Sequence, residues 1–396
     1  MNLDLSKRIL PIIVFSQFCC TSLWFAGNGV ITDLIITFNL EVSALGFLTS
    51  AVQFGFIMGT FLFAFFTITD RFSPSKVFFV CAILCAFFNA LVVFPSQTIY
   101  SLILLRFSTG FFLAGIYPVG MKIAADYYQK GLGKSLGFLV GALVLGTAFP
   151  HLLKGFSQFI SWQYVVYITS GIAVLGGVLI LVFVPDGPFR KSAKAIDLSV
   201  IFKIFRNSNF RSAAFGYFGH MWELYAFWAF IPLLLTTYVK MHPGTSFNIP
   251  LLSFSIIALG GIACVIAGYL SQKFKTIHVA TTALVLSAIC CLVSPLFFEI
   301  NSEIIFVAFA VFWGMVVIAD SPLFSTLVAQ TVNPEFKGTA LTIVNCLGYS
   351  LTIISIMLFN YLMAFVPLNY LFVMLAIGPV LGFSALVSKM VFKKKV

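Results

Sequence analysis

Apolar residues run along this chain in long, nearly unbroken stretches, with short polar segments between them. An apolar stretch of about 20 residues crosses the roughly 30 Å hydrocarbon core of a bilayer as a helix. A transmembrane β-barrel would instead show alternating segments of about half that length. The pattern predicts an all-α integral membrane protein with twelve spans, at approximately residues 9–34, 43–68, 77–96, 100–125, 135–160, 164–185, 209–238, 250–271, 278–298, 303–328, 339–363 and 368–389.

The composition agrees with this pattern and gives the helices a direction. Hydrophobic residues make up 61% of the chain and charged residues only 9%. If the amino terminus is cytoplasmic, 19 of the 23 Lys and Arg residues fall on the cytoplasmic side, as the positive-inside rule requires. We therefore expect a multi-pass protein of the cell inner membrane with both termini in the cytoplasm. The net charge of +11 then reflects topology and does not indicate nucleic acid binding.

The chain also divides into two similar halves. A polar, basic segment predicts a bundle of six helices over residues 1–185, a cytoplasmic loop over 186–208 and a second bundle over 209–396. An internal repeat appears at an offset of about 204 residues. Its matches are Trp24 with Trp228, Tyr117-Pro118 with Ser321-Pro322, and the loop at Asp70-Arg71 with Gln272-Lys273.

The same loop carries a motif that resembles the major facilitator superfamily of secondary transporters. Asp70, Arg71 and Lys76 fit the family signature between the second and third spans, whereas Phe66 and Ser73 replace its two glycines. Arg106 and Gly110 are similar to the Arg-x-x-x-Gly pattern of the fourth span. The resemblance implies two pseudo-symmetric six-helix bundles and transport by alternating access. It also implies a gating role for Asp70 and Arg71 near the amino end of the eleventh helix. The alternative is that both are ordinary loop charges.

Polar residues inside the spans follow helical spacing. The first span has Gln17, Thr21, Trp24 and Asn28 on one face, the fifth has Thr147, His151, Lys154 and Gln158, and the eleventh has Thr342, Asn345, Tyr349 and Thr352. Polar stripes of this kind are typical of helices that line a water-filled path. The candidate substrate-binding residues are Gln17, Thr21, Trp24, Asn28, Arg106, Tyr117, His151, Lys154, Trp228, Asn345 and Tyr349.

Ionisable residues within spans are costly and usually functional. Glu223 lies near the middle of the seventh span with His220 three residues away, and Asp320 lies in the tenth span before Pro322. We predict that Glu223, Asp320 and His220 are candidates for proton coupling. The alternatives are a structural bond from Glu223 to His220 or to a cation, and pairing of Asp320 with Lys154 or Lys122.

These features favour a proton-coupled symporter of a small polar or anionic organic solute. The alternative is an antiporter that exports amphipathic compounds or a metabolite in exchange for protons. The interior cations Arg106 and Lys154 require either an acidic partner or an anionic substrate. No catalytic, metal-binding or nucleotide-binding motif is present in the sequence, so we expect neither an enzyme nor a cofactor. The expected partners are the solute, protons and membrane lipid, and the chain is expected to act as a monomer.

Overall fold

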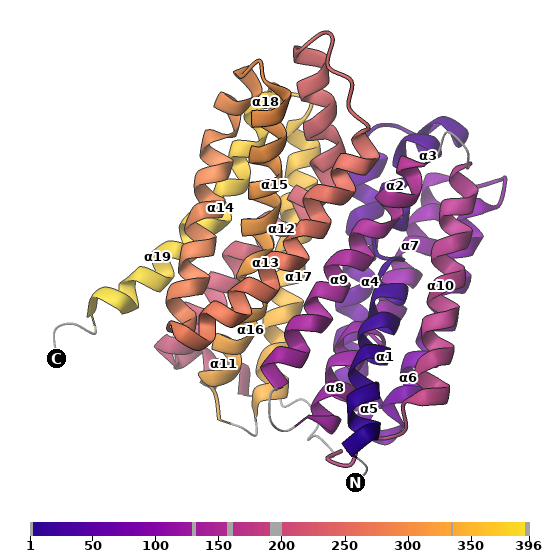
Figure 1. Ribbon diagram of the computed structural model, residues 1–396, viewed down its shortest axis with the longest axis vertical. Helices are drawn as coiled ribbons and strands as arrows, with labels where there is room; N and C mark the ends of the chain where they lie inside the picture. The colour runs from indigo at the N-terminus through magenta and orange to yellow at the C-terminus, as the bar shows by residue number, and fades with distance from the viewer. Residues whose placement is uncertain (1–2, 129–131, 157–160, 191–199, 334–335, 393–396) are drawn as a thin grey trace. The chain divides into compact units, whose positions relative to one another are not determined.

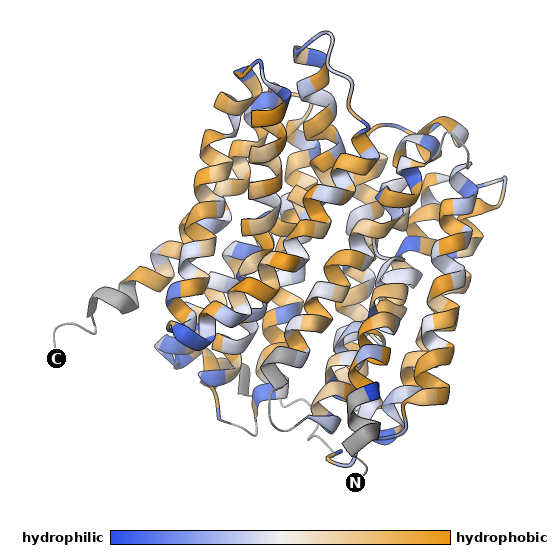
Figure 2. Cartoon of the chain, in the orientation of Figure 1, coloured by the Kyte–Doolittle hydropathy of each residue, from blue (hydrophilic) through white to orange (hydrophobic). Residues whose placement is uncertain are grey.

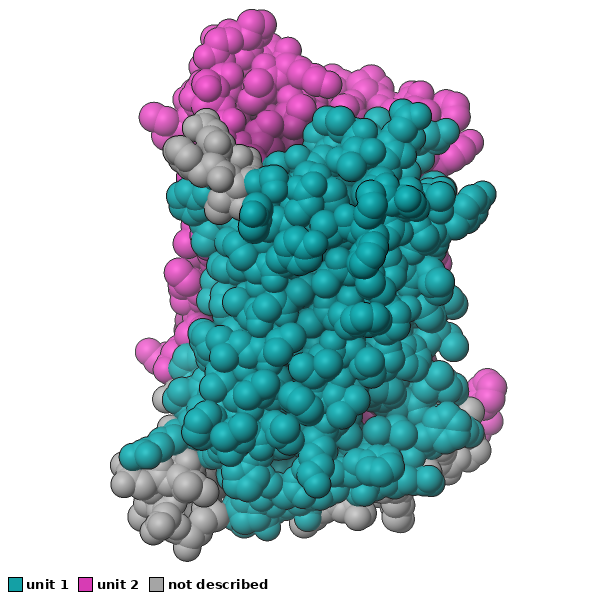
Figure 3. Space-filling view, turned by 90° about the vertical axis from the view of Figure 1, so that its right-hand side faces the viewer, with its two compact units in different colours: residues 1–196 teal, residues 197–396 magenta. Residues whose placement is uncertain are grey.

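The structure is a computed structural model that describes residues 3–128, 132–156, 161–190, 200–333 and 336–392. The chain forms two compact units, residues 1–196 (unit 1) and residues 197–396 (unit 2), which are coloured separately in Figure 3. Every regular element of the described residues is a helix, and most are long (Figure 1).

The described residues of unit 1 form six helices of 15 residues or more and several shorter ones. In chain order they are α1 (Leu3–Thr21), α2 (Ala26–Gly29), α3 (Ile31–Thr37), α4 (Ala44–Phe65), α5 (Ile68–Arg71), α6 (Pro74–Ala90), η1 (Leu91–Val93), α7 (Ile99–Leu113), α8 (Tyr117–Tyr127), α9 (Leu132–Gly155) and α10 (Trp162–Phe183).

Unit 2 is built in the same way. It contains α11 (Val200–Arg206), α12 (Ser208–Met241), α13 (Ile249–Lys273), α14 (Thr276–Glu299), α15 (Glu303–Ala319), α16 (Ser321–Gln330), α17 (Lys337–Leu362), α18 (Leu368–Leu371), η3 (Phe372–Ala376) and α19 (Ile377–Phe392).

The helices are long and apolar enough to span a membrane. Eleven helical stretches of the described residues meet both conditions, and a shorter apolar helix covers Arg8–Thr21 in the first predicted span. Hydrophobic residues cover most of the helix lengths, and hydrophilic residues gather mainly near their ends (Figure 2). A helix satisfies its own backbone hydrogen bonds, which hydrocarbon cannot do, so long apolar sequences fold this way. The expected all-α membrane architecture is confirmed.

Three of the predicted spans are interrupted. The first breaks after Thr21, before α2 begins at Ala26, the fourth breaks between α7 and α8, and the tenth breaks at Asp320 between α15 and α16. Pro118 and Pro322 lie in the first turn of α8 and α16. Proline has no N–H and its ring clashes with the carbonyl four residues before it, so each proline ends the preceding helix.

The internal repeat is visible in the packing. Helix α4 packs on α7 and α6 on α10 in unit 1, and the equivalent helices α13 and α15, and α14 and α19, pack together in unit 2. Gly110 lies against the Val52 carbonyl and Gly314 against the Ile256 carbonyl, and a Cβ at either glycine would clash with that carbonyl. Both the glycines and their partners are 204 residues apart. The offset of the sequence repeat therefore matches a structural repeat, in which α4 crosses α7 in the same way as α13 crosses α15.

An apolar cluster in unit 1 fixes the short helix α3. Leu34 of α3 packs with Leu102 of α7 and with Val165 and Val166 of α10, and all four are at most 1% exposed. Burial of such side chains is the main force that fixes a short helix, which is marginal by itself. The cluster positions the preceding residue, Asp33, for an ion pair described below.

Candidate functional site

The carboxyl group of Glu223 lies inside unit 2, part-way along α12, and the residue is 1% exposed. Its Oε1 accepts a hydrogen bond from Trp313 Nε1 of α15 at 2.8 Å and one from the Cys291 thiol of α14 at 3.2 Å. Ser287 Oγ, also on α14, is hydrogen-bonded to Oε2. Two neighbouring helices therefore hold the carboxyl group through neutral side chains.

These partners respond differently when the carboxyl group gains or loses a proton. The indole N–H of Trp313 can only donate, whereas the Ser287 hydroxyl can donate or accept by rotating. An ionised Glu223 accepts from both. A Glu223 protonated on Oε2 keeps the Trp313 bond on Oε1 and donates its own O–H to Ser287. The same side chains thus satisfy both protonation states without the movement of a helix.

A second ionisable pair lies one helical turn away along α12. His220 Nδ1 is 2.8 Å from Oδ1 of Asp320, the residue at the break between α15 and α16, and both residues are 1% exposed. The two atoms are within ion-pair distance but are not aligned as a hydrogen bond. His220 Nε2 is also buried without a hydrogen-bond partner among the described residues. The pair connects the break in the tenth span to α12.

Together these residues form what we call the acid cluster: Glu223, His220, Asp320, Ser287, Cys291 and Trp313. Within the described part of the chain, no Lys or Arg forms an ion pair with either carboxyl group. The same residues also contain no group of three His, Cys, Asp or Glu side chains placed to hold a metal ion. Two buried acids and one imidazole cannot be neutral when both acids are ionised, whatever the charge of His220.

The interior lysines of unit 1 have acidic partners of their own. Lys154 Nζ of α9 is 2.7 Å from Asp33 Oδ2, and Lys122 Nζ of α8 is 2.9 Å from Asp70 Oδ1. The alternative pairing of Asp320 with Lys154 or Lys122 concerns both units and stays a prediction. Of the two ways to satisfy Lys154, the structure shows the acidic partner.

The gating candidates Asp70 and Arg71 lie on the short helix α5. Besides its pair with Lys122, Asp70 receives a contact from the central loop, because Arg190 Nη2 donates to the Asp70 carbonyl at 3.1 Å. Arg71 Nε donates to the nearby Thr67 hydroxyl at 3.1 Å. The expected role of Asp70 at the amino end of α17 concerns both units and stays a prediction.

Arg106 of α7 is 1% exposed and binds the broken part of the first span. Its Nη2 donates to the carbonyls of Leu23 at 3.0 Å and Trp24 at 2.6 Å, and its Nη1 donates to Asn89 Oδ1 at 3.0 Å. The amide of Asn89 in turn donates to Ser170 Oγ at 2.9 Å. Arg106 thus binds two backbone carbonyls at the break in the first span. No carboxylate among the described residues pairs with its charge.

Other predicted residues of unit 1 fall into two groups. Thr21 donates to the Gln17 carbonyl, and Asn28 donates to Thr49, both at 2.8 Å. Gln17 and His151 are buried, and both amide atoms of Gln17 and Nε2 of His151 have no hydrogen-bond partner among the described residues. These atoms therefore keep hydrogen-bonding capacity that the described protein groups do not use. The stripe residue Gln158 lies outside the described residues.

The aromatic candidates pack within each unit. In unit 1, the ring of Trp24 lies 4.7 Å from that of Phe56, and Tyr117 is partly exposed at the start of α8. In unit 2, Tyr225 packs edge-on against Trp228 at 5.4 Å, and its hydroxyl lies 2.9 Å from that of Tyr349.

Asn345, also of α17, is partly exposed one turn before Tyr349. The structure therefore brings Trp228 and Tyr349 together through Tyr225, a residue outside the candidate set.

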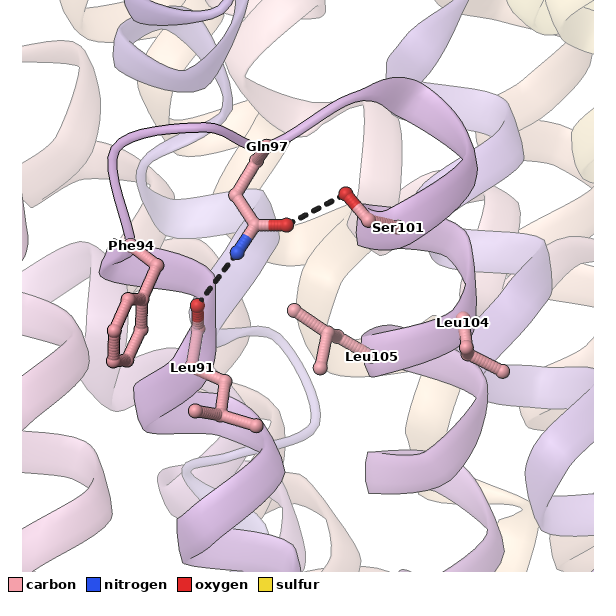
Figure 4. A pocket seen from close by; sticks show the side chains of 6 residues that line it. All are labelled: Leu91, Phe94, Gln97, Ser101, Leu104 and Leu105. Atoms are coloured by element: carbon pink, nitrogen blue, oxygen red, sulfur yellow. Dashed lines mark hydrogen bonds between the residues drawn. The ribbon is translucent and has the colours of Figure 1, made fainter.

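A cavity of about 220 Å³ near the start of α7 is unlike a solute site. Gln97 Nε2 donates to the Leu91 carbonyl at 2.8 Å, and Ser101 Oγ donates to Gln97 Oε1 at 2.6 Å (Figure 4). The remaining lining residues shown, Phe94, Leu104 and Leu105, are apolar. The Gln97 amide is therefore bound locally, and the rest of the surface is apolar.

The sequence also matches a model of a known protein family. The model of the Major Facilitator Superfamily matches residues 13–357, most of the chain. This chain belongs to the major facilitator superfamily. A curated relative, the Ascochitine biosynthesis cluster MFS transporter of Didymella fabae, is 25% identical over 173 residues. That match covers 42% of this chain and 31% of the relative's length.

Solved structures of the superfamily share the fold. The proton:xylose symporter XylE has a TM-score of 0.75 at 14% identity, over 98% of this chain and 96% of that chain. The human organic anion transporter MFSD10 has a TM-score of 0.72 at 14% identity, over 96% of this chain and 99% of that chain. The nucleoside transporter NupG has a TM-score of 0.71 at 14% identity, over 97% of this chain and 99% of that chain. These likenesses confirm the twelve-helix fold.

Sequence reasoning missed several residues of the site. Ser287 and Cys291 lie on α14, the ninth span, and neither was a candidate residue. The sequence does contain a pattern that could have identified them. Ser287, Cys291 and Ser294 are four and three residues apart, which places three small polar side chains on one helical face. Trp313 is not among the candidate residues of the sequence analysis, because a tryptophan in an apolar span also serves as packing. The role of Asn89 beside Arg106 had no signal in the sequence beyond being polar in an apolar span.

Proposed function

We propose that this superfamily member is a proton-coupled secondary transporter that imports a small polar organic solute, neutral or anionic. The observation that carries the proposal is the acid cluster of unit 2. It contains two buried carboxyl groups and one imidazole, and no Lys or Arg among the described residues forms an ion pair with either carboxyl group. Proton binding is the direct way to neutralise such a cluster, because an unpaired ionised carboxylate in a dry interior costs several kcal/mol.

Glu223 is the best candidate for the transported proton. A hydrogen bond to an ionised group contributes about 1.5–3 kcal/mol, so the donors around Glu223 offset much of the several kcal/mol that desolvation costs. The ionised and protonated forms are then close in free energy. A carrier must load a proton on one side of the membrane and release it on the other, which requires such a balance.

The solute contacts of unit 1 are proposed from its free polar atoms. Gln17 of α1, Gln53 of α4 and His151 of α9 are buried and have side-chain atoms without a hydrogen-bond partner among the described residues. Amides and neutral imidazoles donate and accept, which suits hydroxyl, amide or carboxylate groups. In unit 2 we retain Asn345 and Tyr349 as proposed contacts. The structural relatives include proteins named as sugar and nucleoside transporters, which supports a polar organic solute.

An exchange of amphipathic compounds for protons is the second candidate. The aromatic groups formed by Trp24 with Phe56, and by Tyr225 with Trp228 and Tyr349, favour an organic ligand with apolar surface. The acid cluster serves either direction, because proton release and uptake are reversible. The acid cluster therefore does not distinguish import from export, and the transport experiment below does.

We also propose insertion in the cell inner membrane with both termini in the cytoplasm. The distribution of 19 of 23 basic residues on that side supports this topology.

The proposal is tested by transport into vesicles that contain only the purified protein. Labelled sugars, nucleosides, amino acids, organic acids and cationic dyes are presented with and without an imposed proton gradient. Symport predicts uphill accumulation of one class when the external side is acidic, and its loss when a protonophore is added. Uphill movement of a dye or metabolite against the proton flow would support exchange. Accumulation that follows a sodium gradient and ignores protons would contradict the proposal.

A further inference from the structure

A surface cavity lies at the end of unit 2 where α13 meets α14. It is a cavity of about 560 Å³, and the residues that matter for the argument are Leu270, Lys273, Phe274, Lys275, His278 and Val279. Two lysines and a histidine are exposed around it, Thr282 also lines it, and the other lining residues are apolar. We call these residues the basic pocket.

The basic charges of the pocket are not neutralised by the protein. Neither Lys273, Lys275 nor His278 forms an ion pair with a carboxylate of the described chain. The sequence explains why, since no Asp or Glu occurs from residue 224 to residue 298. Helix α13 therefore has no acid at all, and the single acid of α14, Glu299, lies at the opposite end of that helix.

The equivalent loop of unit 1 shows the contrast. There Asp70 pairs with Lys122 at 2.9 Å, and Arg190 pairs with Asp186 at 2.6 Å. In the repeat, Gln272 stands where unit 1 has Asp70. Unit 1 thus has acids beside this loop that pair with Lys122 and Arg190, whereas no described carboxylate pairs with the lysines of the unit 2 loop.

The apolar surroundings indicate what kind of anion fits. Phe274 is 61% exposed at the pocket, and Ile262 and Ile266, on the preceding turns of α13, are 54% and 48% exposed. This apolar face belongs to a helix long enough to span the bilayer. A ligand at this position meets positive charge at one end and apolar surface beside it. Basic residues next to a membrane-spanning helix attract anionic headgroups.

We propose that the basic pocket binds the headgroup of an anionic phospholipid, with its acyl chains along the Ile262 and Ile266 face of α13. The start of α14 assists, because N–H groups of its first turn have no intrahelical partners and Lys275 at the N-cap makes no side-chain cap bond. This site is independent of the acid cluster and of the proposed coupling.

The test measures lipid binding to the delipidated full-length protein by native mass spectrometry. Phosphatidylglycerol and phosphatidylcholine with identical acyl chains are titrated against wild type and against Lys273→Gln/Lys275→Gln. Wild type should prefer phosphatidylglycerol, and the double variant should lose about fivefold of that preference for each lysine. The control Lys76→Gln/Lys240→Gln removes the same charge from exposed lysines elsewhere and should keep the preference.

Three outcomes would overturn the proposal. The first is equal binding of the two lipids by wild type, and the second is an equal loss of preference in the control variant. The third is displacement of phosphatidylglycerol by excess inorganic phosphate, which would show a site for free anions and not for a lipid. Because the exposed lysines make no described ion pair, the double variant is expected to fold, and an unchanged circular dichroism melting profile checks this.

Discussion

The contacts of Arg106 predict that its replacement destabilises unit 1 and does not change selectivity for solute charge. Arg106→Gln removes three described hydrogen bonds, to the carbonyls of Leu23 and Trp24 and to Asn89. Interhelical hydrogen bonds in membrane proteins average about 0.6 kcal/mol, and bonds from charged groups reach about 1.5–3 kcal/mol. Since glutamine keeps part of the donor capacity, we expect a loss of about 2 to 5 kcal/mol.

Thermal unfolding of the detergent-solubilised protein measures this loss. For a domain of this size, 1 kcal/mol corresponds to about 2–4 °C in Tm, so Arg106→Gln should lower Tm by at least about 4 °C. Arg106→Lys keeps the charge but has no guanidinium fork, so it should restore only part of the stability. An unchanged Tm, together with weaker binding of an acidic solute and unchanged binding of its neutral amide, would refute this reasoning and make Arg106 a substrate ligand.

Two further predictions concern packing and topology. Gly110→Ala and Gly314→Ala each place a methyl group against a carbonyl of the neighbouring helix and should destabilise by about 1–3 kcal/mol. The control Gly171→Ala meets nothing within 4 Å, so its unfolding temperature should stay the same or rise, and equal losses at all three positions would contradict the packing described for the two glycines. Ser246 lies in the exposed loop before α13, and Gln272 is exposed in the last turn of α13, so Ser246→Cys and Gln272→Cys mark opposite ends of this helix. A membrane-impermeant maleimide should label the first from the periplasm and the second from the cytoplasm, and labelling of both from one side would reject the topology.

The sequence predicted the helices because lipid imposes a simple rule on them. A helix of about 20 apolar residues is the only economical way to cross hydrocarbon, so hydropathy locates each span. The interruptions were harder to predict. Pro322 marked the break in the tenth span, but the break after Thr21 has no proline. It is held by Arg106, which is 82 residues from Trp24 in the chain, and such a long-range contact leaves no local pattern.

The residues of the acid cluster were predicted only in part, again because contacts between distant parts of the chain leave no local pattern. An acid in an apolar span is conspicuous, so Glu223 and Asp320 were identified, but their partners are small or aromatic residues that also serve as packing. Spacing placed His220 beside Glu223 on one helix, whereas the fold turns His220 toward Asp320 and Glu223 toward Ser287 and Trp313. Residues three apart on a helix differ by about 60° in direction, which is enough to reach different neighbours.

The central claim is that Glu223 carries the coupled proton, and proton-driven accumulation in Glu223→Gln vesicles tests it most directly. The new amide can accept from Trp313 through its oxygen and donate to Ser287 through its nitrogen, so the fold should be retained. Glu299→Gln is the matched control, because Glu299 is exposed at the end of α14. The solute is the one that wild type accumulates in the transport panel.

Glu223→Gln should abolish uphill accumulation under an inward proton gradient while it keeps solute binding and solute exchange, and Glu299→Gln should accumulate like wild type. If Asp320→Asn shows that loss and Glu223→Gln does not, the proton resides on Asp320. If both variants still concentrate the solute under a proton gradient, neither carboxyl group is the obligatory carrier, and proton coupling through the acid cluster is refuted.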